Sequence, residues 1–186
     1  GDIDGDGIAE ICLTSTLSSA SAEYGGAVYI FSAAMEGTYG AEAWADILVT
    51  GAEDRMELGA RLIAGEDLDG DGYGDLVVSS TDVESWAGGI WLWPGPIEAD
   101  RDTDDATVRI QGEGEEFGLG GALEVPGDMD ADGVDDLVTS ALAGVTGPKR
   151  VLLYSGPLAG SLTPTDATTT WLDAEDTLFF GLVGGA

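Results

Sequence analysis

One acidic motif occurs three times along the chain, and this repetition limits the possible folds more than any other feature. The copies read GDIDGDGIAEICL from Gly1, EDLDGDGYGDLVV from Glu66 and GDMDADGVDDLVT from Gly127. Counted from the first aspartate of each copy, the spacings are 65 and 61 residues. A regular period of this kind indicates a chain built from repeated structural units.

The apolar segments between the acidic motifs are short and have the composition of β-strands. Runs such as LVVSS, IWLW and TVRI are rich in β-branched or aromatic residues and are bounded by Gly, Pro, Asp or Ser. Four such strands in a unit of about 60 residues are typical of a β-propeller blade. We therefore predict an all-β fold of three four-stranded β-propeller blades that form part of a larger propeller.

The predicted units span residues 1–65, 66–126 and 127–186, and in each blade the acidic loop joins the innermost strand to the second strand. The first unit begins at its acidic loop, and the third ends with LFFGLVGGA, which reads as the first strand of a next blade. A closed ring needs about four to eight blades. We therefore interpret the chain as a segment of a longer propeller, and the alternative is that several chains join tail to head. Within the first unit, AEAWADILV (41–49) is predicted as a strand from its place in the repeat, although its composition also suits a helix.

Each acidic loop has the pattern Asp-x-Asp-x-Asp-Gly-x-x-Asp/Glu. A tight turn directs the carboxylates of positions 1, 3 and 5 inward, position 7 offers a backbone carbonyl, and position 9 adds a last carboxylate. Oxygen-only ligand sets of this kind suit Ca²⁺ better than Zn²⁺ or copper. We expect about three Ca²⁺ ions, one per loop, and the predicted ligands are Asp2, Asp4, Asp6, Ile8, Glu10, Asp67, Asp69, Asp71, Tyr73, Asp75, Asp128, Asp130, Asp132, Val134 and Asp136.

Electrostatic repulsion within the loops supports a bound cation. Two carboxylates about 5 Å apart repel by roughly 3 kcal/mol at an effective dielectric constant of about 20. A marginally stable fold is therefore not expected to gather four of them three times without a compensating ion. The simpler reading, in which Asp and Gly only form solvated turns, fits one such loop better than three in register. An EF-hand is excluded because position 12 is Leu13, Val78 or Thr139 rather than an acid.

The overall composition excludes several classes of function. The chain has 36 acidic and 6 basic residues and a formal charge of −30, so it offers no basic surface for nucleic acid. It has no histidine and one cysteine, which excludes histidine-based catalysis and cysteine-rich zinc sites. No apolar run approaches the roughly 18 residues that cross a bilayer. The start at Gly1 without Met suggests a processed or excised piece of a longer protein.

A Phe-Gly or Leu-Gly pair lies ahead of the acidic loops. Phe117-Gly118 precedes Asp128–Val138, Leu58-Gly59 precedes Asp67–Val78, and incomplete copies lie at Asp2 and at Phe180-Gly181. This pattern resembles the FG-GAP repeat of integrin α-chain N-terminal propellers and of many bacterial surface proteins. The resemblance implies a propeller, usually of seven blades, with Ca²⁺ in the loops between the first two strands of a blade.

The residues and the resemblance together predict a function without catalysis. We expect a calcium-binding propeller segment of an extracellular or cell-surface protein, in which Ca²⁺ is structural and the blades mediate adhesion or bind a protein or surface glycan. The first alternative is a carbohydrate-binding propeller, with Trp86 stacking on a sugar while Trp91 and Trp93 pack between blades. The second is a subunit that self-associates through its complementary ends. A polysaccharide lyase or glycosidase is disfavoured because the clustered acids are assigned to calcium and histidine is absent.

Overall fold

The computed structural model describes residues 1–32, 37–38, 40–82, 87–114, 118–142 and 149–173. Within these ranges the chain forms thirteen strands, one α-helix of four residues and two short 3₁₀ helices. The prediction of an all-β fold is therefore confirmed.

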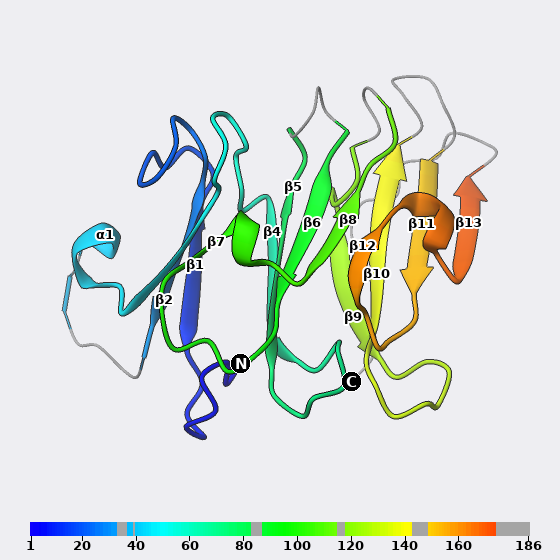
Figure 1. Cartoon of the computed structure of the whole chain (residues 1–186), viewed down its shortest axis with the longest axis horizontal. Coiled ribbons are helices and arrows are strands. Elements are labelled where there is room, and N and C mark those ends of the chain that lie inside the picture. Colours follow the sequence, from blue (N-terminus) through cyan, green and yellow to red (C-terminus); the bar gives the residue numbers. More distant parts are fainter. Residues whose placement is uncertain (33–36, 39, 83–86, 115–117, 143–148, 174–186) are drawn as a thin grey trace.

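The strands form three sheets that stand side by side in chain order (Figure 1). The first sheet contains β1 (Ile11–Ser15), β2 (Ala27–Phe31), β3 (Ile47–Thr50) and β7 (Arg101–Asp102). The second contains β4 (Arg61–Glu66), β5 (Asp75–Ser80), β6 (Gly89–Trp93), β8 (Val108–Gln111) and β12 (Gly160–Leu162). The third contains β9 (Leu123–Gly127), β10 (Asp136–Leu142), β11 (Lys149–Tyr154) and β13 (Thr169–Asp173).

Each sheet is an antiparallel meander, and the outer edges of the first two sheets are extended by the following unit. The strands β4, β5, β6 and β8 pair antiparallel in sequence, and β9, β10, β11 and β13 repeat this order. The short strand β7 then pairs in parallel with β3 of the preceding sheet, and β12 pairs in parallel with β8. Consecutive blades therefore share hydrogen bonds at their outer edges.

The first sheet differs from the others at its inner edge. The second and third acidic loops follow β4 and β9, which pair with β5 and β10. In the part of the chain that the structure describes, no strand pairs with the corresponding edge of β1. The segment LFFGLVGGA, predicted as the first strand of a next blade, lies outside the described residues.

Apolar layers fill the two spaces between neighbouring sheets. Strand β5 is buried along its whole length because one of its faces packs toward the first sheet and the other toward the third. Two-sided burial explains why its sequence is a continuous apolar run rather than an alternating one. Trp91 and Trp93 lie buried in the layer between the first two sheets, as predicted from the sequence.

The outer face of the first sheet has no such cover from a described sheet. Ile11 and Leu13 on β1 are 54% and 49% exposed, whereas the corresponding Leu76 and Val78 on β5 are fully buried. The short helix α1 (Ala41–Trp44) and Ala45 pack over part of this face, against Tyr29 and its neighbours on β2.

Two details of the repeat differ from the sequence-based expectations. Residues 41–44 of the predicted strand 41–49 form α1, and only Ile47–Thr50 is extended. This helix precedes the outer strand, as do η1 (Thr103–Asp105) and η2 (Pro164–Asp166) in the later units. A helical turn at this point is therefore part of the unit.

The second difference concerns the Phe-Gly pair of the third unit. Leu58 forms an isolated bridge with Gly26, and Leu119 forms the equivalent bridge with Gly88. Leu119-Gly120 therefore corresponds to Leu58-Gly59, two residues after the predicted pair Phe117-Gly118. Phe117 itself lies outside the described residues.

Candidate metal centre

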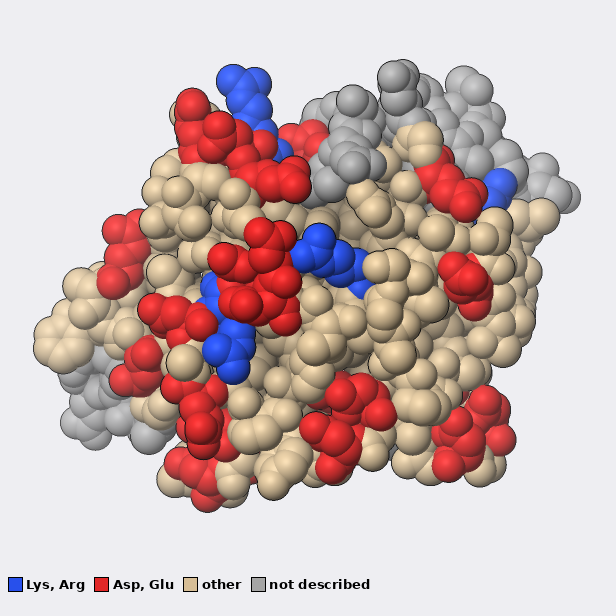
Figure 2. All heavy atoms as spheres, in the orientation of Figure 1, with Lys and Arg blue, Asp and Glu red and all other residues tan. Residues whose placement is uncertain are grey.

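The three acidic loops lie along one edge of the molecule because each occupies the same place in its unit. The second loop connects β4 to β5, the third connects β9 to β10, and the first precedes β1. Figure 1 places all three at the lower ends of the sheets, and Figure 2 shows separate groups of acidic side chains along that edge. The prediction that the loop joins the innermost and second strands is confirmed for the second and third units.

The aspartate at position 1 folds the loop around its own carboxylate. In the first loop, Asp2 accepts hydrogen bonds from the N–H groups of Gly5 at 2.8 Å and Gly7 at 2.9 Å. Asp67 and Asp128 accept the equivalent bonds in their loops. The glycine at position 6 has φ between +88° and +97° in all three loops, a conformation that side chains with a Cβ rarely adopt.

The aspartates at positions 3 and 5 are oriented by the same kind of short bond. The N–H of Asp6 donates to Asp4 at 3.0 Å, and the N–H of Ile8 donates to Asp6 at 2.7 Å. The other two loops repeat both contacts. Each carboxylate oxygen has a second lone pair, so these bonds fix the direction of a carboxylate without using up its capacity for a cation.

Carboxylate oxygens converge in each loop, although not from the same positions. In every group the potential ligand atoms lie within 4.8 Å of one another. The groups are Asp2, Asp4, Asp6 and Glu10; Asp67, Asp69 and Asp71; and Asp128, Asp130 and Asp136. Of the predicted carboxylate ligands, Asp75 and Asp132 are not brought into these groups. The carbonyls of Ile8, Tyr73 and Val134 stay predicted ligands.

The residue at position 9 fastens the loop to the rest of its unit. Asp75 is fully buried and accepts from the N–H of Leu68 at 2.9 Å and of Gly95 at 3.1 Å. Asp136 accepts from Met129 at 2.8 Å and Gly156 at 3.0 Å in the same way.

Glu10 makes only one of the two bonds found at position 9 in the later loops. Its Oε2 accepts from the N–H of Ile3 at 2.8 Å. Its Oε1 is buried without a hydrogen-bond partner, and the residue is only 7% exposed. A buried carboxylate oxygen that lacks a donor is costly, and this atom belongs to the residue that completes the first group of four acids.

Burial and hydrogen bonding move the pKa values of the loop acids in opposite directions. Burial raises the pKa of Asp75 to about 6, against the lowering effect of its two backbone donors. Burial also raises the pKa of Asp69. The N–H of Gly133 is the main cause that lowers the pKa of the exposed Asp128. The raised pKa values mark positions where a nearby positive charge would favour the ionised form.

Sequence reasoning missed the glycine turns that hold the position-9 carboxylates. Gly95 and Gly156 follow the third strand of their units, and each is followed by proline. A Cβ at Gly95 would lie 2.5 Å from the Gly74 carbonyl oxygen, and one at Gly156 would lie 2.7 Å from the Asp135 carbonyl oxygen. The recurring Gly-Pro pair was the available signal, but only the folded chain brings it against the acidic loop.

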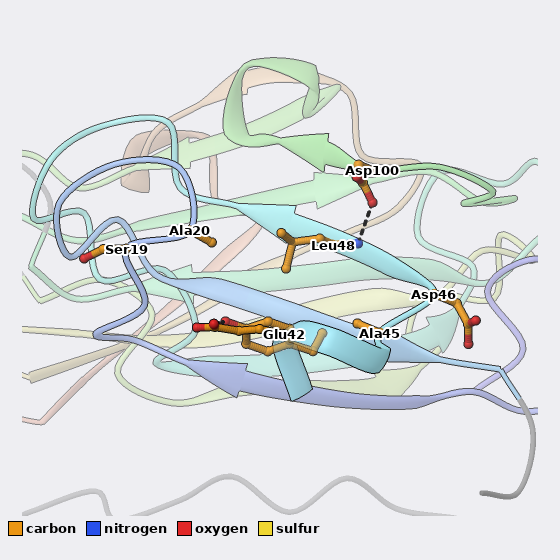
Figure 3. A pocket seen from close by; sticks show the side chains of 8 residues that line it. Ser19, Ala20, Glu42, Ala45, Asp46, Leu48 and Asp100 are labelled. Atoms are coloured by element: carbon orange, nitrogen blue, oxygen red, sulfur yellow. Dashed lines mark hydrogen bonds between the residues drawn. The ribbon is translucent and has the colours of Figure 1, made fainter. Parts of the chain in front are cut away.

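A separate pocket of about 440 Å³ lies on the outer face of the first sheet (Figure 3). It is lined by Ser19, Ala20, Tyr29, Glu42, Ala45, Asp46, Leu48 and Asp100. The corresponding place on the second sheet, beside Trp91, is a cavity of about 60 Å³ that Met56 of the first unit helps to line.

The tryptophans of the second unit form no sugar-stacking site among the described residues. Trp91 and Trp93 are buried between sheets and do not present a face for stacking on a sugar. Trp86 lies outside the described residues. None of the helices in the described ranges has the length and apolar character needed to span a membrane.

A comparison with protein families gives a match that coincides with the central unit. The model of the FG-GAP repeat matches residues 58–93, from Leu58 through β4, the second acidic loop and β5 to the end of β6. The chain matches no curated protein. FG-GAP repeats occur in propeller domains of extracellular or surface proteins, and these domains are usually non-catalytic. The chain therefore contains an FG-GAP repeat at residues 58–93, and its three sheets are arranged as successive β-propeller blades.

Proposed function

We propose that the three acidic loops bind Ca²⁺ and that the ions stabilise a propeller segment whose function is binding rather than catalysis. The observation that carries the proposal is Glu10. Its Oε1 is buried and lacks a donor, and the residue belongs to a group of four carboxylates. A cation within the first loop would supply the missing partner and offset the repulsion among the four acids.

The chemistry of the donors favours calcium over other ions. The groups contain only carboxylates, with backbone carbonyls and water available to complete the shell, and hard oxygen ligands suit Ca²⁺ and Mg²⁺. Ca²⁺ accepts six to eight ligands in a flexible arrangement, whereas Mg²⁺ requires a near-ideal octahedron. The unequal ligand groups of the three loops suit the more tolerant ion.

We assign the ions a structural role, because among the described residues neither a histidine nor a cysteine joins the carboxylate groups. At millimolar Ca²⁺ and a dissociation constant near 10⁻⁴ M, each ion would contribute about 1.4 kcal/mol to the free energy of unfolding. Three ions would therefore contribute about 4 kcal/mol, a substantial part of the stability of a domain. Sites of this affinity are occupied at the millimolar Ca²⁺ concentration found outside the cell. This agrees with the occurrence of FG-GAP repeats in extracellular and surface proteins.

The partner is a protein or a surface glycan that contacts the exposed loops of the propeller. Carbohydrate binding at Trp86 and self-association through the chain ends stay predictions, because Trp86 and residues 174–186 lie outside the described part of the chain. Glycan-array binding that is lost in Trp86→Ala would establish the first alternative. A molecular mass by light scattering above that of one chain, and lowered by chelator, would establish the second.

Calorimetric titration of the chelator-treated protein with Ca²⁺, combined with thermal melts, tests the proposal. We expect about three sites and a melting temperature about 8–16 °C higher in millimolar Ca²⁺ than in chelator, since about 4 kcal/mol shifts a chain of this size by that amount. Mg²⁺ at the same concentration is the control and should stabilise less. Equal melting temperatures in Ca²⁺ and chelator would show that the loops are ordinary turns.

A further inference from the structure

We propose that calcium binding in neighbouring loops is coupled across the blade interface through the peptide groups at loop position 2. The inference rests on the proposed calcium sites and adds a mechanism by which they influence one another. Position 2 is Ile3 in the first loop and Leu68 in the second, and both side chains are fully buried beside the acidic groups.

The peptide groups of Leu68 connect the second loop to the third unit. Its N–H donates to Oδ2 of Asp75, the position-9 residue of its own loop, at 2.9 Å. Its carbonyl accepts from the N–H of Leu158 at 2.8 Å, and Leu158 belongs to the third unit. A movement of the Asp75 carboxylate would therefore shift Leu68, whose carbonyl is hydrogen-bonded to Leu158 of the third unit.

The turn that carries Leu158 also holds the third acidic loop. The N–H of Gly156 donates to Oδ1 of Asp136 at 3.0 Å, and Oδ2 of the same carboxylate accepts from Met129 at 2.8 Å. A direct contact runs in parallel, because the N–H of Asp135 donates to the carbonyl of Asp67 at 3.1 Å. The second and third loops are thus joined by two routes of hydrogen bonds.

The same arrangement joins the first and second loops. The N–H of Ile97 donates to the carbonyl of Ile3 at 2.7 Å, and the N–H of Gly95 in the same turn donates to Oδ1 of Asp75 at 3.1 Å. The N–H of Ile3 then donates to Glu10 at 2.8 Å. A series of hydrogen bonds, connected by the short backbone segments 95–97 and 156–158, therefore runs from Glu10 in the first loop to Met129 in the third.

Side-chain packing follows the same path. A Cβ at Gly5, position 4 of the first loop, would lie 3.2 Å from the ring of Tyr73 at position 7 of the second loop. A Cβ at Gly70 would lie 3.1 Å from Val134 in the same way. Position 7 of each later loop thus packs against position 4 of the loop before it.

This connectivity gives coupling a physical cause. An ion that fixes Asp67 and Asp69 also fixes the Leu68 peptide groups between them, and so holds the 156–158 turn and the Asp136 carboxylate in place. Part of the ordering cost of the third loop is then met before its own ion binds, which makes the second binding event more favourable. Reciprocity requires calcium binding in the third loop to raise the calcium affinity of the second loop by the same factor.

The test is a Ca²⁺ titration of the whole chain followed by amide NMR. The N–H groups of Gly7, Gly72 and Gly133 each bond to the first aspartate of their own loop, so they report the loops separately. In the unmodified chain we expect the three titration midpoints to fall together, with curves steeper than independent sites give.

The decisive variant is Asp69→Asn, which removes a charge from the second loop and retains the oxygen that accepts from Asp71. Coupling predicts that the midpoints at Gly7 and Gly133 rise about fivefold although their own loops are unchanged. Glu23→Gln is the control for the lost charge, because Glu23 is exposed and lies at the far end of the first sheet from the loops. It should leave all midpoints unchanged.

Two glycine variants each perturb one of the two blade interfaces and leave every carboxylate in place. Gly156→Ala forces the 156–158 turn away from Asp135 and should uncouple the third loop only, whereas Gly95→Ala forces its turn away from Gly74 and should uncouple the first loop only. Gly40→Ala is the matched control, because a Cβ at Gly40 meets no atom within 4 Å.

Amide exchange provides a readout that needs no affinity measurement. We expect the Ile97 and Leu158 amides to exchange faster in chelator than in Ca²⁺, and the Leu158 amide to stay fast in Asp69→Asn with Ca²⁺ present. Unchanged midpoints at Gly7 and Gly133 in Asp69→Asn would overturn the coupling and leave the calcium sites standing. Absence of any response to millimolar Ca²⁺ at all three glycines would instead overturn the proposed calcium sites.

Discussion

The first and second acidic loops adopt the same turn conformation but differ in the hydrogen bonds of the residue at position 9. Asp75 uses both oxygens to accept backbone N–H groups, from Leu68 and Gly95. Glu10 accepts only from Ile3, and its second oxygen is buried without a partner. Both carboxylate oxygens of the position-9 residue in the second loop therefore have hydrogen-bond donors from the protein. In the first loop one carboxylate oxygen has no donor, and a cation could neutralise it.

A glycine turn holds the position-9 residue of the second loop. Gly95 approaches Asp75 closely because it has no Cβ, and an added Cβ would lie 2.5 Å from Gly74. The sequence of the first unit has Ala33 at the corresponding place, outside the described residues. One sequence pattern thus contains two kinds of carboxylate, one that holds the fold and one that is available to an ion.

The largest expected effect comes from Asp75→Asn. An amide can accept one of the two N–H groups but presents its own N–H₂ to the other, which strands a buried donor. We expect a loss of about 2 kcal/mol in the free energy of unfolding, or a melting temperature about 4–8 °C lower, both in Ca²⁺ and in chelator. Thermal melts under the two conditions measure it. A loss confined to Ca²⁺ would show that Asp75 acts mainly as a ligand, which would remove the contrast with Glu10.

Glu10→Gln should give a smaller effect whose sign depends on calcium. In Ca²⁺ the variant should be about 1 kcal/mol less stable, since the first ion binds more weakly. In chelator it should be more stable than the unmodified chain, because a neutral amide costs less to bury than a carboxylate with an unpartnered oxygen. Urea unfolding with and without chelator measures both. The same sign under the two conditions would contradict the assignment of Glu10 as an ion ligand.

Ile8→Ala should have the smallest effect. The predicted ligand at position 7 is the backbone carbonyl, and the Ile8 side chain is 54% exposed. The stoichiometry of calcium binding should stay the same, and the free energy of unfolding should change by no more than about 0.5 kcal/mol. Isothermal titration calorimetry provides the stoichiometry. Loss of one site would show that side-chain packing, and not the carbonyl, determines binding at position 7.

The strands and the position of the acidic loops could be predicted because their signals are local. Short apolar runs such as that of β5 define strands by composition, and the spacing of the aspartates places the loops between strands. The orientation of positions 1, 3 and 5 also follows from local turns, in which each carboxylate accepts a nearby N–H. These parts required no knowledge of distant contacts.

The remaining features depend on contacts between units. The strands β7 and β12 are two and three residues long, too short for any periodic signal, and they exist because the preceding sheet offers an open edge. The helix α1 lacks the capping boxes found at Asp102 and Thr163, so its sequence carried no start signal. The hydrogen bond from Gly95 to Asp75 likewise forms only when the glycine turn folds back onto the loop, and the unpartnered Oε1 of Glu10 is visible only in the folded chain.

The exchange of β7 and β12 between units has a consequence for dissection of the chain. A cut at the 65/66 boundary would separate β7 from the sheet it completes, and a cut at 126/127 would do the same to β12. Excised single repeats would each lose a strand from their own edge or carry one that lacks a sheet. The smallest piece that retains a complete outer edge is a pair of adjacent repeats, so limited proteolysis should release fragments whose ends do not coincide with the sequence period.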